Sequence, residues 1–195
     1  MRRIRVIEFL SLDGVMQSLG SPAEDATGGF RHGGWGRPYG DATLGAWATA
    51  GQGTTDAYLF GRVTYEKMAA FWPTQPDADP MAASLNAAPK YVASTTLRSL
   101  SWRNAMLLQG DVRSAVAALR DGEGGDIAVL GSGVLVRTLL AHDLVDELEL
   151  FIHPLVLGSG KRLFGSSDEV LRLDLVDCVR TTTGVILTRY RRAGA

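Results

Sequence analysis

The stretch Tyr58-Leu-Phe-Gly-Arg-Val-Thr-Tyr-Glu66 predicts a buried strand that runs through a glycine and an arginine into a helix. Its first three residues are bulky and apolar, as is typical of strands, and apolar side chains recur at helical spacing over residues 64–72. Gly61 has no Cβ, so the chain can turn sharply there. Unpaired N–H groups at a helix N-terminus favour anions, and the guanidinium of Arg62 suits phosphate. The stretch therefore predicts either a phosphate site or an ordinary strand-to-helix connection of an α/β protein.

Length and charge limit the classes of protein that this sequence can encode. A chain of 195 residues suits one domain, which we predict to span residues 1–195, and it is long enough to bury about 70% of its unfolded surface. Lys and Arg number 20 against 21 Asp and Glu, for a formal net charge of -1. Neither a basic face for nucleic acid nor an acidic tail is expected, so a small-molecule ligand is favoured.

The cysteine content and the apolar runs predict a cytoplasmic protein. The single cysteine, Cys178, has no partner for a disulfide, and we expect it to be a small apolar residue in a strand. Glu8 interrupts the apolar stretch near the N-terminus, which argues against a signal peptide. No run of about 18 apolar residues is present, so no membrane partner is expected.

The N-terminal part of the chain predicts a strand, a long loop and a helix. Residues 4–10 form the strand, which ends in a turn signal, Ser11-Leu12-Asp13-Gly14. The loop over residues 16–40 is longer than most connections, which indicates a lid, a binding loop or an insert. Its aromatic residues either stack on a flat ligand or anchor the loop itself. They are Phe30, Trp35 and Tyr39. Asp41 is the predicted N-cap of a helix that ends near residues 51–53.

Alternating strands and helices follow, and then the pattern changes. Strands are predicted at residues 91–94, 105–109 and 126–130, with helices after the last two. After residue 142 the apolar residues alternate with period two, over residues 145–153, 171–175 and 185–190, which favours antiparallel strands. We therefore predict an α/β fold with a mixed sheet, parallel in its β-α-β part and antiparallel at its C-terminal edge.

Three predicted strand ends carry small or hydroxyl-bearing residues: Gly61-Arg62-Val63-Thr64, Ser94-Thr95-Thr96 and Gly131-Ser132-Gly133. Ligands of open sheets bind outside the carboxyl ends of parallel strands, so three such loops suit a dinucleotide. Arg62 and the neighbouring hydroxyl groups favour the 2′-phosphate of NADPH. The full Gly-x-Gly-x-x-Gly fingerprint is absent because residue 136 is valine, which disfavours a standard Rossmann domain. Taken alone, each loop is equally consistent with an ordinary turn.

Other chemistries find less support in the sequence. His32, His142 and His153 do not have the spacing of metal ligands, so no metal site is predicted, and His153 is expected to be structural. The Gly-x-Ser-x-Gly elbow of serine hydrolases is not matched at Gly131-Ser132-Gly133. Gly160-Lys161-Arg162 lacks the Ser or Thr of a phosphate-binding Walker loop.

These motifs, taken in order with Asp146-Glu147-Leu148 and the run Pro154-Leu-Val-Leu-Gly-Ser-Gly160, resemble the dihydrofolate-reductase-like superfamily. Within it, the resemblance is to the branch that contains the C-terminal reductase domain of the bifunctional riboflavin-biosynthesis deaminase-reductase. The resemblance covers nearly the whole chain. It implies a three-layer fold around a mostly parallel mixed sheet, NADPH as hydride donor, and a homodimer.

The resemblance also implies roles for individual residues. Cofactor binding is expected at eight positions: Gly61, Arg62, Thr64, Ser94, Thr95, Gly131, Ser132 and Gly133. Asp13 and Asp41 are the expected catalytic carboxylates, with Gly14, Phe30 and Trp35 on the substrate side. The helix after the first loop has no carboxylate in its interior, where folate reductases place one, and Asp41 at its start is the candidate counterpart.

The function implied is NADPH-dependent reduction of a planar heterocycle. The acceptor would resemble that of 5-amino-6-(5-phosphoribosylamino)uracil reductase of riboflavin biosynthesis, or that of a dihydrofolate or pterin reductase. The zinc-binding His and Cys residues of the fused deaminase are not found in this sequence. The alternative is a non-catalytic protein that keeps the fold and binds NADPH or another ligand.

Overall fold

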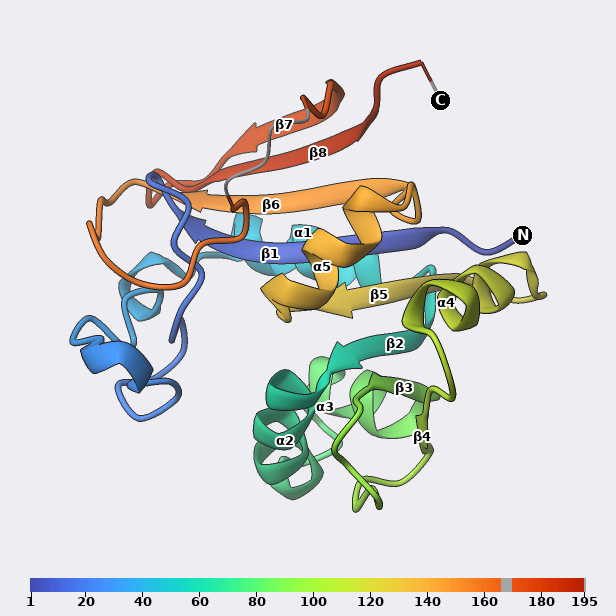
Figure 1. Ribbon diagram of the computed structural model, residues 1–195. Helices are drawn as coiled ribbons and strands as arrows, with labels where there is room; N and C mark the ends of the chain where they lie inside the picture. Colours follow the sequence, from blue (N-terminus) through green and yellow to red (C-terminus); the bar gives the residue numbers. More distant parts are fainter. Residues whose placement is uncertain (166–169, 195) are drawn as a thin grey trace. The chain divides into compact units, whose positions relative to one another are not determined.

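The computed structural model describes residues 1–165 and 170–194 (Figure 1). Its strands are β1 (Ile4–Ser11), β2 (Thr55–Gly61), β3 (Lys90–Ala93), β4 (Ala105–Leu107), β5 (Asp126–Leu130), β6 (Glu147–His153), β7 (Leu173–Arg180) and β8 (Ile186–Arg192). Its α-helices are α1 (Ala42–Gln52), α2 (Arg62–Phe71), α3 (Pro80–Ala87), α4 (Val112–Asp121) and α5 (Gly133–Ala141). Short 3-10 helices are η1 (Thr27–Gly29), η2 (Arg37–Tyr39) and η3 (Trp72–Thr74).

The strands form one mixed sheet in the order β4-β3-β2-β5-β1-β6-β8-β7. β2 pairs in parallel with β3 and β5, and β3 pairs in parallel with β4. At the other end of this order, β8 pairs antiparallel with both β6 and β7. The predicted fold class, with a parallel β-α-β part and antiparallel C-terminal strands, is confirmed.

The chain divides into two compact units. Unit 1 comprises Met1–Val6 and Ala48–Val145, and unit 2 comprises Ile7–Trp47 and Asp146–Ala195. In unit 1, α5 and α2 both pack against β2, and α2 also contacts β3. In unit 2, Leu44 and Trp47 from the first half of α1 pack against the hydrophobic cluster of Phe151, Val185 and Leu187. The assignment of residues 1–195 to a single domain stays a prediction.

Unit 2 has a hydrophobic core that explains why its strands and the start of α1 stay together. Phe151, Val185 and Leu187 are almost fully buried. Phe9 stacks on Phe151 with ring centroids 4.3 Å apart. The partly buried residues packed around them are Ile7, Phe9, Tyr39, Leu44, Trp47 and Val179. Burying side chains of this size stabilises the unit by about 1.5–3 kcal/mol each.

Cys178 corrects one prediction. It lies in β7, as a strand residue, but its side chain is exposed rather than buried as a small apolar residue. β7 is the last strand in the sheet order, and most of its residues are exposed, which explains the difference. The period-two pattern identified the strand and did not reveal its place at the edge.

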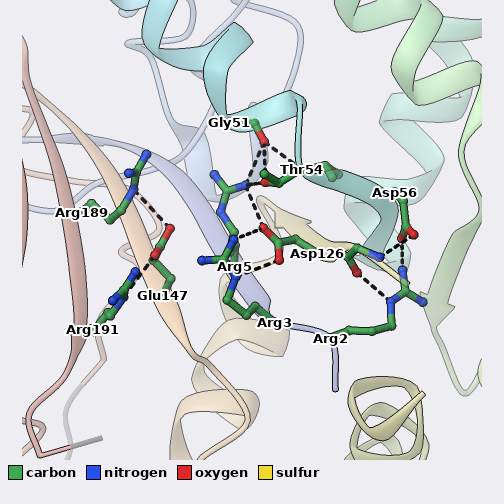
Figure 2. Close-up of polar contacts among 12 residues, drawn as sticks. Arg2, Arg3, Arg5, Gly51, Thr54, Asp56, Asp126, Glu147, Arg189 and Arg191 are labelled. Atoms are coloured by element: carbon green, nitrogen blue, oxygen red, sulfur yellow. Dashed lines mark hydrogen bonds and ion pairs between the residues drawn. The ribbon is translucent and has the colours of Figure 1, made fainter. Parts of the chain in front are cut away.

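Arginine side chains fix the amino ends of the parallel strands in unit 1 (Figure 2). Arg3 forms a bidentate ion pair with Asp126, the first residue of β5, through Nε at 2.9 Å and Nη2 at 2.7 Å. Arg5 Nη1 donates to the carbonyl oxygen of Gly51 at 2.8 Å and lies 3.5 Å from Asp126 Oδ2. Arg2 pairs with Asp56 at the start of β2. These guanidinium groups are engaged in structural pairs, so we assign them to the scaffold.

Unit 2 contains two buried carboxylates on β6 whose burial the alternating pattern did not predict. Glu149 is 1% exposed and accepts a hydrogen bond from the indole Nε1 of Trp47. Glu147 is 4% exposed and pairs with Arg189 at 3.2 Å and Arg191 at 3.5 Å, as Figure 2 shows. Buried charges persist when they are paired in this way.

Over residues 1–165 and 170–194, no helix is both long and apolar enough to cross a bilayer.

Candidate cofactor and substrate sites

Two of the three predicted phosphate loops contact each other in unit 1. β2 and β5 are neighbours, with Leu59 paired to Val129, so their carboxyl ends lie together. The backbone N–H of Gly61 donates to Ser132 Oγ at 2.9 Å. Gly131 has φ +57°, and a Cβ added there would lie 3.2 Å from both Cγ2 and Oγ1 of Thr64. The glycine is therefore needed both for its backbone conformation and for the close approach of the two loops.

Two helices begin at this point without side-chain caps. α2 begins after Gly61, which is extended, and α5 begins after Ser132, which is left-handed with φ 69°. Neither cap residue accepts a hydrogen bond from its helix through a side chain. The first N–H groups of an α-helix have no acceptor within the helix, and the helix dipole favours negative charge there. Two such N-termini, linked by the contact between Gly61 and Ser132, suit a ligand with more than one phosphate.

The third loop follows the strand next to β2. Gly61 pairs with Ala93 in the parallel register, so Ser94 and Thr95 continue the chain beside the β2–α2 junction. Ser94 Oγ accepts hydrogen bonds from the N–H groups of Thr96 at 3.2 Å and Leu97 at 3.0 Å. A hydroxyl group that accepts in this way can still donate its proton to a phosphate oxygen.

Arg62 is available for a charged ligand. Its Nη1 lies 2.9 Å from Glu66 Oε2 one helical turn away, and both side chains are 44% exposed. Exposed ion pairs of this kind contribute about 0–1 kcal/mol to stability. A phosphate can therefore replace the carboxylate as partner of Arg62 at little cost. Unit 1 thus contains all eight of the predicted cofactor residues.

The predicted catalytic and substrate residues all belong to unit 2. The carboxylate of Asp13 accepts from the N–H groups of Leu157 at 3.0 Å and Gly158 at 2.9 Å, and from Ser11 Oγ at 2.7 Å. Arg162 Nη2 donates to it at 2.9 Å. The hydrogen bond from Ser11, followed by that from Leu157, lowers the pKa of Asp13 well below its ordinary value. Asp13 is an anion that ties the end of β1 to the loop after β6.

Asp41 has defined hydrogen-bond partners, and Gly14 has a defined backbone conformation. Asp41 caps α1, as predicted, by accepting from the N–H of Leu44 at 2.8 Å. Its other oxygen accepts from both the N–H and the Oγ1 of Thr182 at 2.7 Å. The bond from Leu44, followed by that from Thr182, lowers the pKa of Asp41. Gly14 has φ +79° in the turn after β1, a conformation that favours glycine.

Phe30 and Trp35 are buried rather than on the surface of the loop, and Phe9, Leu155 and Leu157 from outside the loop pack against their cluster. They are 8% and 7% exposed and form a cluster with Val15. The indole Nε1 of Trp35 donates to the carbonyl oxygen of Gln17 at 2.7 Å. Of the two roles open from the sequence, this arrangement matches that of an anchor for the loop. Their contact with a substrate stays a prediction.

Two buried titratable groups were not assigned to the site from the sequence. His153 is 1% exposed, and its Nδ1 contacts the carbonyl oxygens of Leu10 and Phe151. Glu8 is 3% exposed, and burial raises the pKa of its carboxyl well above the ordinary value. The interruption of the apolar β1 by a glutamate was the available signal for Glu8.

The part of the chain that the structure describes contains no group of three or more His, Cys, Asp or Glu residues arranged for a metal ion.

The mixed sheet and its glycine loops define the class: this is an α/β protein with the dihydrofolate-reductase-like fold. The chain belongs to the RibD C-terminal domain family, whose model matches residues 2–187. Membership of this family supports a reductase-type function. The resemblance expected from the motifs is therefore confirmed.

Two relatives from Bacillus subtilis (strain 168) are similar in sequence. The uncharacterized protein YyaP is 30% identical over 142 residues, which cover 71% of this chain and 75% of YyaP. The uncharacterized protein YwjB is 29% identical over 111 residues, which cover 57% of this chain and 59% of YwjB.

Three solved structures share the fold. A protein of Shewanella sp. PV-4, named provisionally as a riboflavin biosynthesis protein, has a TM-score of 0.76 at 21% identity. This match covers 97% of this chain and 98% of the Shewanella chain. A pyrimidine reductase-like protein of Corynebacterium diphtheriae has a TM-score of 0.65 at 16% identity. This match covers 99% of this chain and 92% of the Corynebacterium chain. Dihydrofolate reductase of Enterococcus faecalis, complexed with NADP(H) and RAB-propyl, has a TM-score of 0.63 at 16% identity. This match covers 98% of this chain and 96% of the reductase chain.

Proposed function

We propose that the protein is an NADPH-dependent reductase of a planar heterocycle. The observation that carries the proposal is the pair of uncapped helix N-termini, α2 and α5, joined by the hydrogen bond from Gly61 N–H to Ser132 Oγ. Family membership and the fold shared with a reductase complexed with NADP(H) support it.

The residues of unit 1 fit the phosphate groups of NADPH. The N–H groups that begin α5, after Gly131 and Ser132, would hold the pyrophosphate. Arg62, Thr64, Ser94 and Thr95 would hold the 2′-phosphate through charge-assisted and hydroxyl hydrogen bonds. When bound, NADPH supplies the hydride, and the protein supplies orientation and electrostatic stabilisation.

For the acceptor, we propose an aminopyrimidine of the riboflavin pathway or a pterin, as in the enzymes that the motifs resemble. Asp13 and Asp41 stay the predicted catalytic residues. Because the pKa of each is lowered, both are ionised at neutral pH, which favours a role as fixed anions over a role as proton donors.

The second candidate is a protein that binds NADPH or a related ligand without turnover. The absence of a carboxylate between residues 42 and 52 of α1 motivates it, since folate reductases place their carboxylate on the corresponding helix.

The experiment that separates these candidates measures binding first and turnover second. NADPH is titrated while tryptophan fluorescence is recorded, and its oxidation is then followed at 340 nm with a panel of pterins, pyrimidines and flavin precursors. Binding with turnover of one acceptor supports the reductase. Binding without turnover of any acceptor favours the second candidate, and no binding of NADPH contradicts both NADPH-based proposals.

Arg62→Ala is expected to weaken NADPH binding by about 10- to 100-fold while leaving NADH binding within about twofold. A charge-assisted hydrogen bond contributes about 1.5–3 kcal/mol, and only NADPH carries the 2′-phosphate. Isothermal titration with both cofactors measures the ratio. Arg113→Ala, at an exposed position on α4, is the control and should leave both affinities unchanged. An equal loss for NADPH and NADH would contradict the assignment of Arg62 to the 2′-phosphate.

We also propose that the chain forms a homodimer through β7. This strand is at the end of the sheet order, and its Leu175 and Val176 are 56% and 45% exposed. Exposed apolar edge strands favour pairing with another strand. Sedimentation should give a dimer at micromolar concentration, and Leu175→Lys should shift it toward monomer. A strict monomer for the unmodified protein would refute the proposal.

A further inference from the structure

His153 occupies an unusual position in unit 2. It is the last residue of β6, and its Nδ1 lies 3.2 Å from the carbonyl oxygen of Leu10 and 3.0 Å from that of Phe151. Carbonyl oxygens only accept hydrogen bonds, so Nδ1 must carry the proton in both contacts. In the neutral ring the lone pair is then on Nε2. The backbone of two strands therefore selects one tautomer of this imidazole.

Aromatic rings from the loop of residues 16–40 surround the same imidazole. Trp35 meets it edge to face, with ring centroids 5.0 Å apart and planes at 88°. Tyr39 meets it in the same way at 5.4 Å and 86°. Phe9 of β1 lies at 6.2 Å in a tilted arrangement. A single side chain thus joins two points of the loop to the ends of β1 and β6.

The surroundings of His153 favour the neutral ring. Burial lowers the pKa of His153 below its ordinary value of 6.5, and the two carbonyl contacts offset this only in part. Protonation would add a charge and a second N–H at a site that is 1% exposed, which is unfavourable without a new acceptor.

The charged groups on the elements around His153 are engaged elsewhere, exposed or on the opposite face of the sheet. On β6, Glu149 lies four residues back on the same face, about 13 Å away along the strand, and accepts from Trp47. On β1, Glu8 points to the opposite face from Phe9. On the loop, the phenol ring of Tyr39 contacts the imidazole edge to face, and Arg37 is exposed. Beyond the strand ends, Asp13 is hydrogen-bonded to Leu157 and Asp41 to Thr182.

We propose that neutral His153 is a positioning residue that holds the loop of residues 16–40 against the ends of β1 and β6, and that protonation of His153 releases this loop. The loop contains Phe30 and Trp35, the predicted substrate-side residues. The consequence for an acceptor substrate rests on the proposed reductase function, whereas the coupling between His153 and the loop does not.

Amide hydrogen exchange of the unmodified protein tests the coupling. After correction for intrinsic exchange rates, exchange in residues 16–40 should be up to about tenfold faster at pH 5.5 than at pH 7.5. The tenfold limit assumes that His153 titrates at its ordinary value of 6.5 once the loop is released. The closed loop favours the neutral ring, so the closed state loses stability as pH falls. Nitrogen NMR of the imidazole should show the Nδ1–H tautomer at pH 7.5.

His153→Gln should abolish the pH response of the loop, since an amide can donate to the same carbonyl oxygens but does not titrate. His32→Gln is the matched control, because His32 is also in the loop and packs on Phe30. It should keep the response of the unmodified protein. A response that survives in His153→Gln, or titration of His153 without any change in loop exchange, would overturn the proposal.

A kinetic measurement with an accepted substrate extends the test to the proposed function. Between pH 7.5 and 5.5 the KM for the acceptor should rise in the unmodified protein and not in His153→Gln, while kcat should follow the same profile in both. If no acceptor is turned over, the reductase proposal fails and the exchange measurement still decides the role of His153.

Discussion

Gly131→Ala is expected to lower the affinity for NADPH by at least about tenfold. A non-glycine residue in the left-handed region costs about 1–2 kcal/mol, and Gly131 has φ +57°. The new Cβ would also lie 3.2 Å from Cγ2 and Oγ1 of Thr64. Relief of this contact moves the start of α5 or Thr64, both of which belong to the proposed phosphate site. A displacement of the N–H donors weakens their hydrogen bonds to the phosphates, and 1.4 kcal/mol corresponds to tenfold in affinity.

Gly110→Ala separates the loss of the site from the loss of stability. Gly110 is also in unit 1 and has φ +74°, but nothing lies within 4 Å of a Cβ added there. Both variants should lose about 1–2 kcal/mol in the free energy of unfolding. Only Gly131→Ala should lose NADPH affinity when each is titrated with the cofactor. Equal affinities for the two variants would show that the contact between Gly131 and Thr64 does not shape the site.

Asp13→Asn is expected to reduce the free energy of unfolding by about 2 kcal/mol or more at pH 7. An amide can accept through only one of its two polar atoms, so donors that now meet the carboxylate would be left without an acceptor. Hydrogen bonds to charged groups contribute about 1.5–3 kcal/mol, and Asp13 accepts from two backbone N–H groups and Arg162. Urea denaturation measures the loss, with Asp121→Asn at the exposed end of α4 as the control.

The pH dependence of this effect has a defined sign. Because the pKa of Asp13 is lower in the folded protein than the ordinary value of 3.8, its contribution is complete above pH 3.8 and is lost as pH falls below it. The difference in stability between the unmodified protein and Asp13→Asn should therefore narrow below pH 3.8. A difference that stays constant down to pH 2 would mean that the carboxylate is not held as an anion by these donors.

The order of the elements and the places of the three loops with glycine or hydroxyl-bearing residues could be predicted from the sequence because their signals are local. Gly61 and Gly131 stand where strands end, and the hydroxyl-bearing residues stand beside them, within a few positions of each other. Helix starts differed by a few residues: α2 begins at Arg62, whereas the apolar spacing indicated residue 64. An extended residue such as Gly61 acts as a cap without any side-chain signal.

The sequence by itself determined the fold class, the positions of the glycine- and hydroxyl-bearing loops at the strand ends and the cap at Asp41, because each depends on residue types that are close together in the chain. Only the tertiary structure decided that Asp13 is bound by Leu157, 144 residues away, and that Glu147, Glu149 and His153 are buried. It also decided that Phe30 and Trp35 are buried in a cluster with Val15 and the residues around it. Burial and long-range hydrogen bonds depend on which distant segments meet, and alternation along one strand carries no information about the partner that covers it.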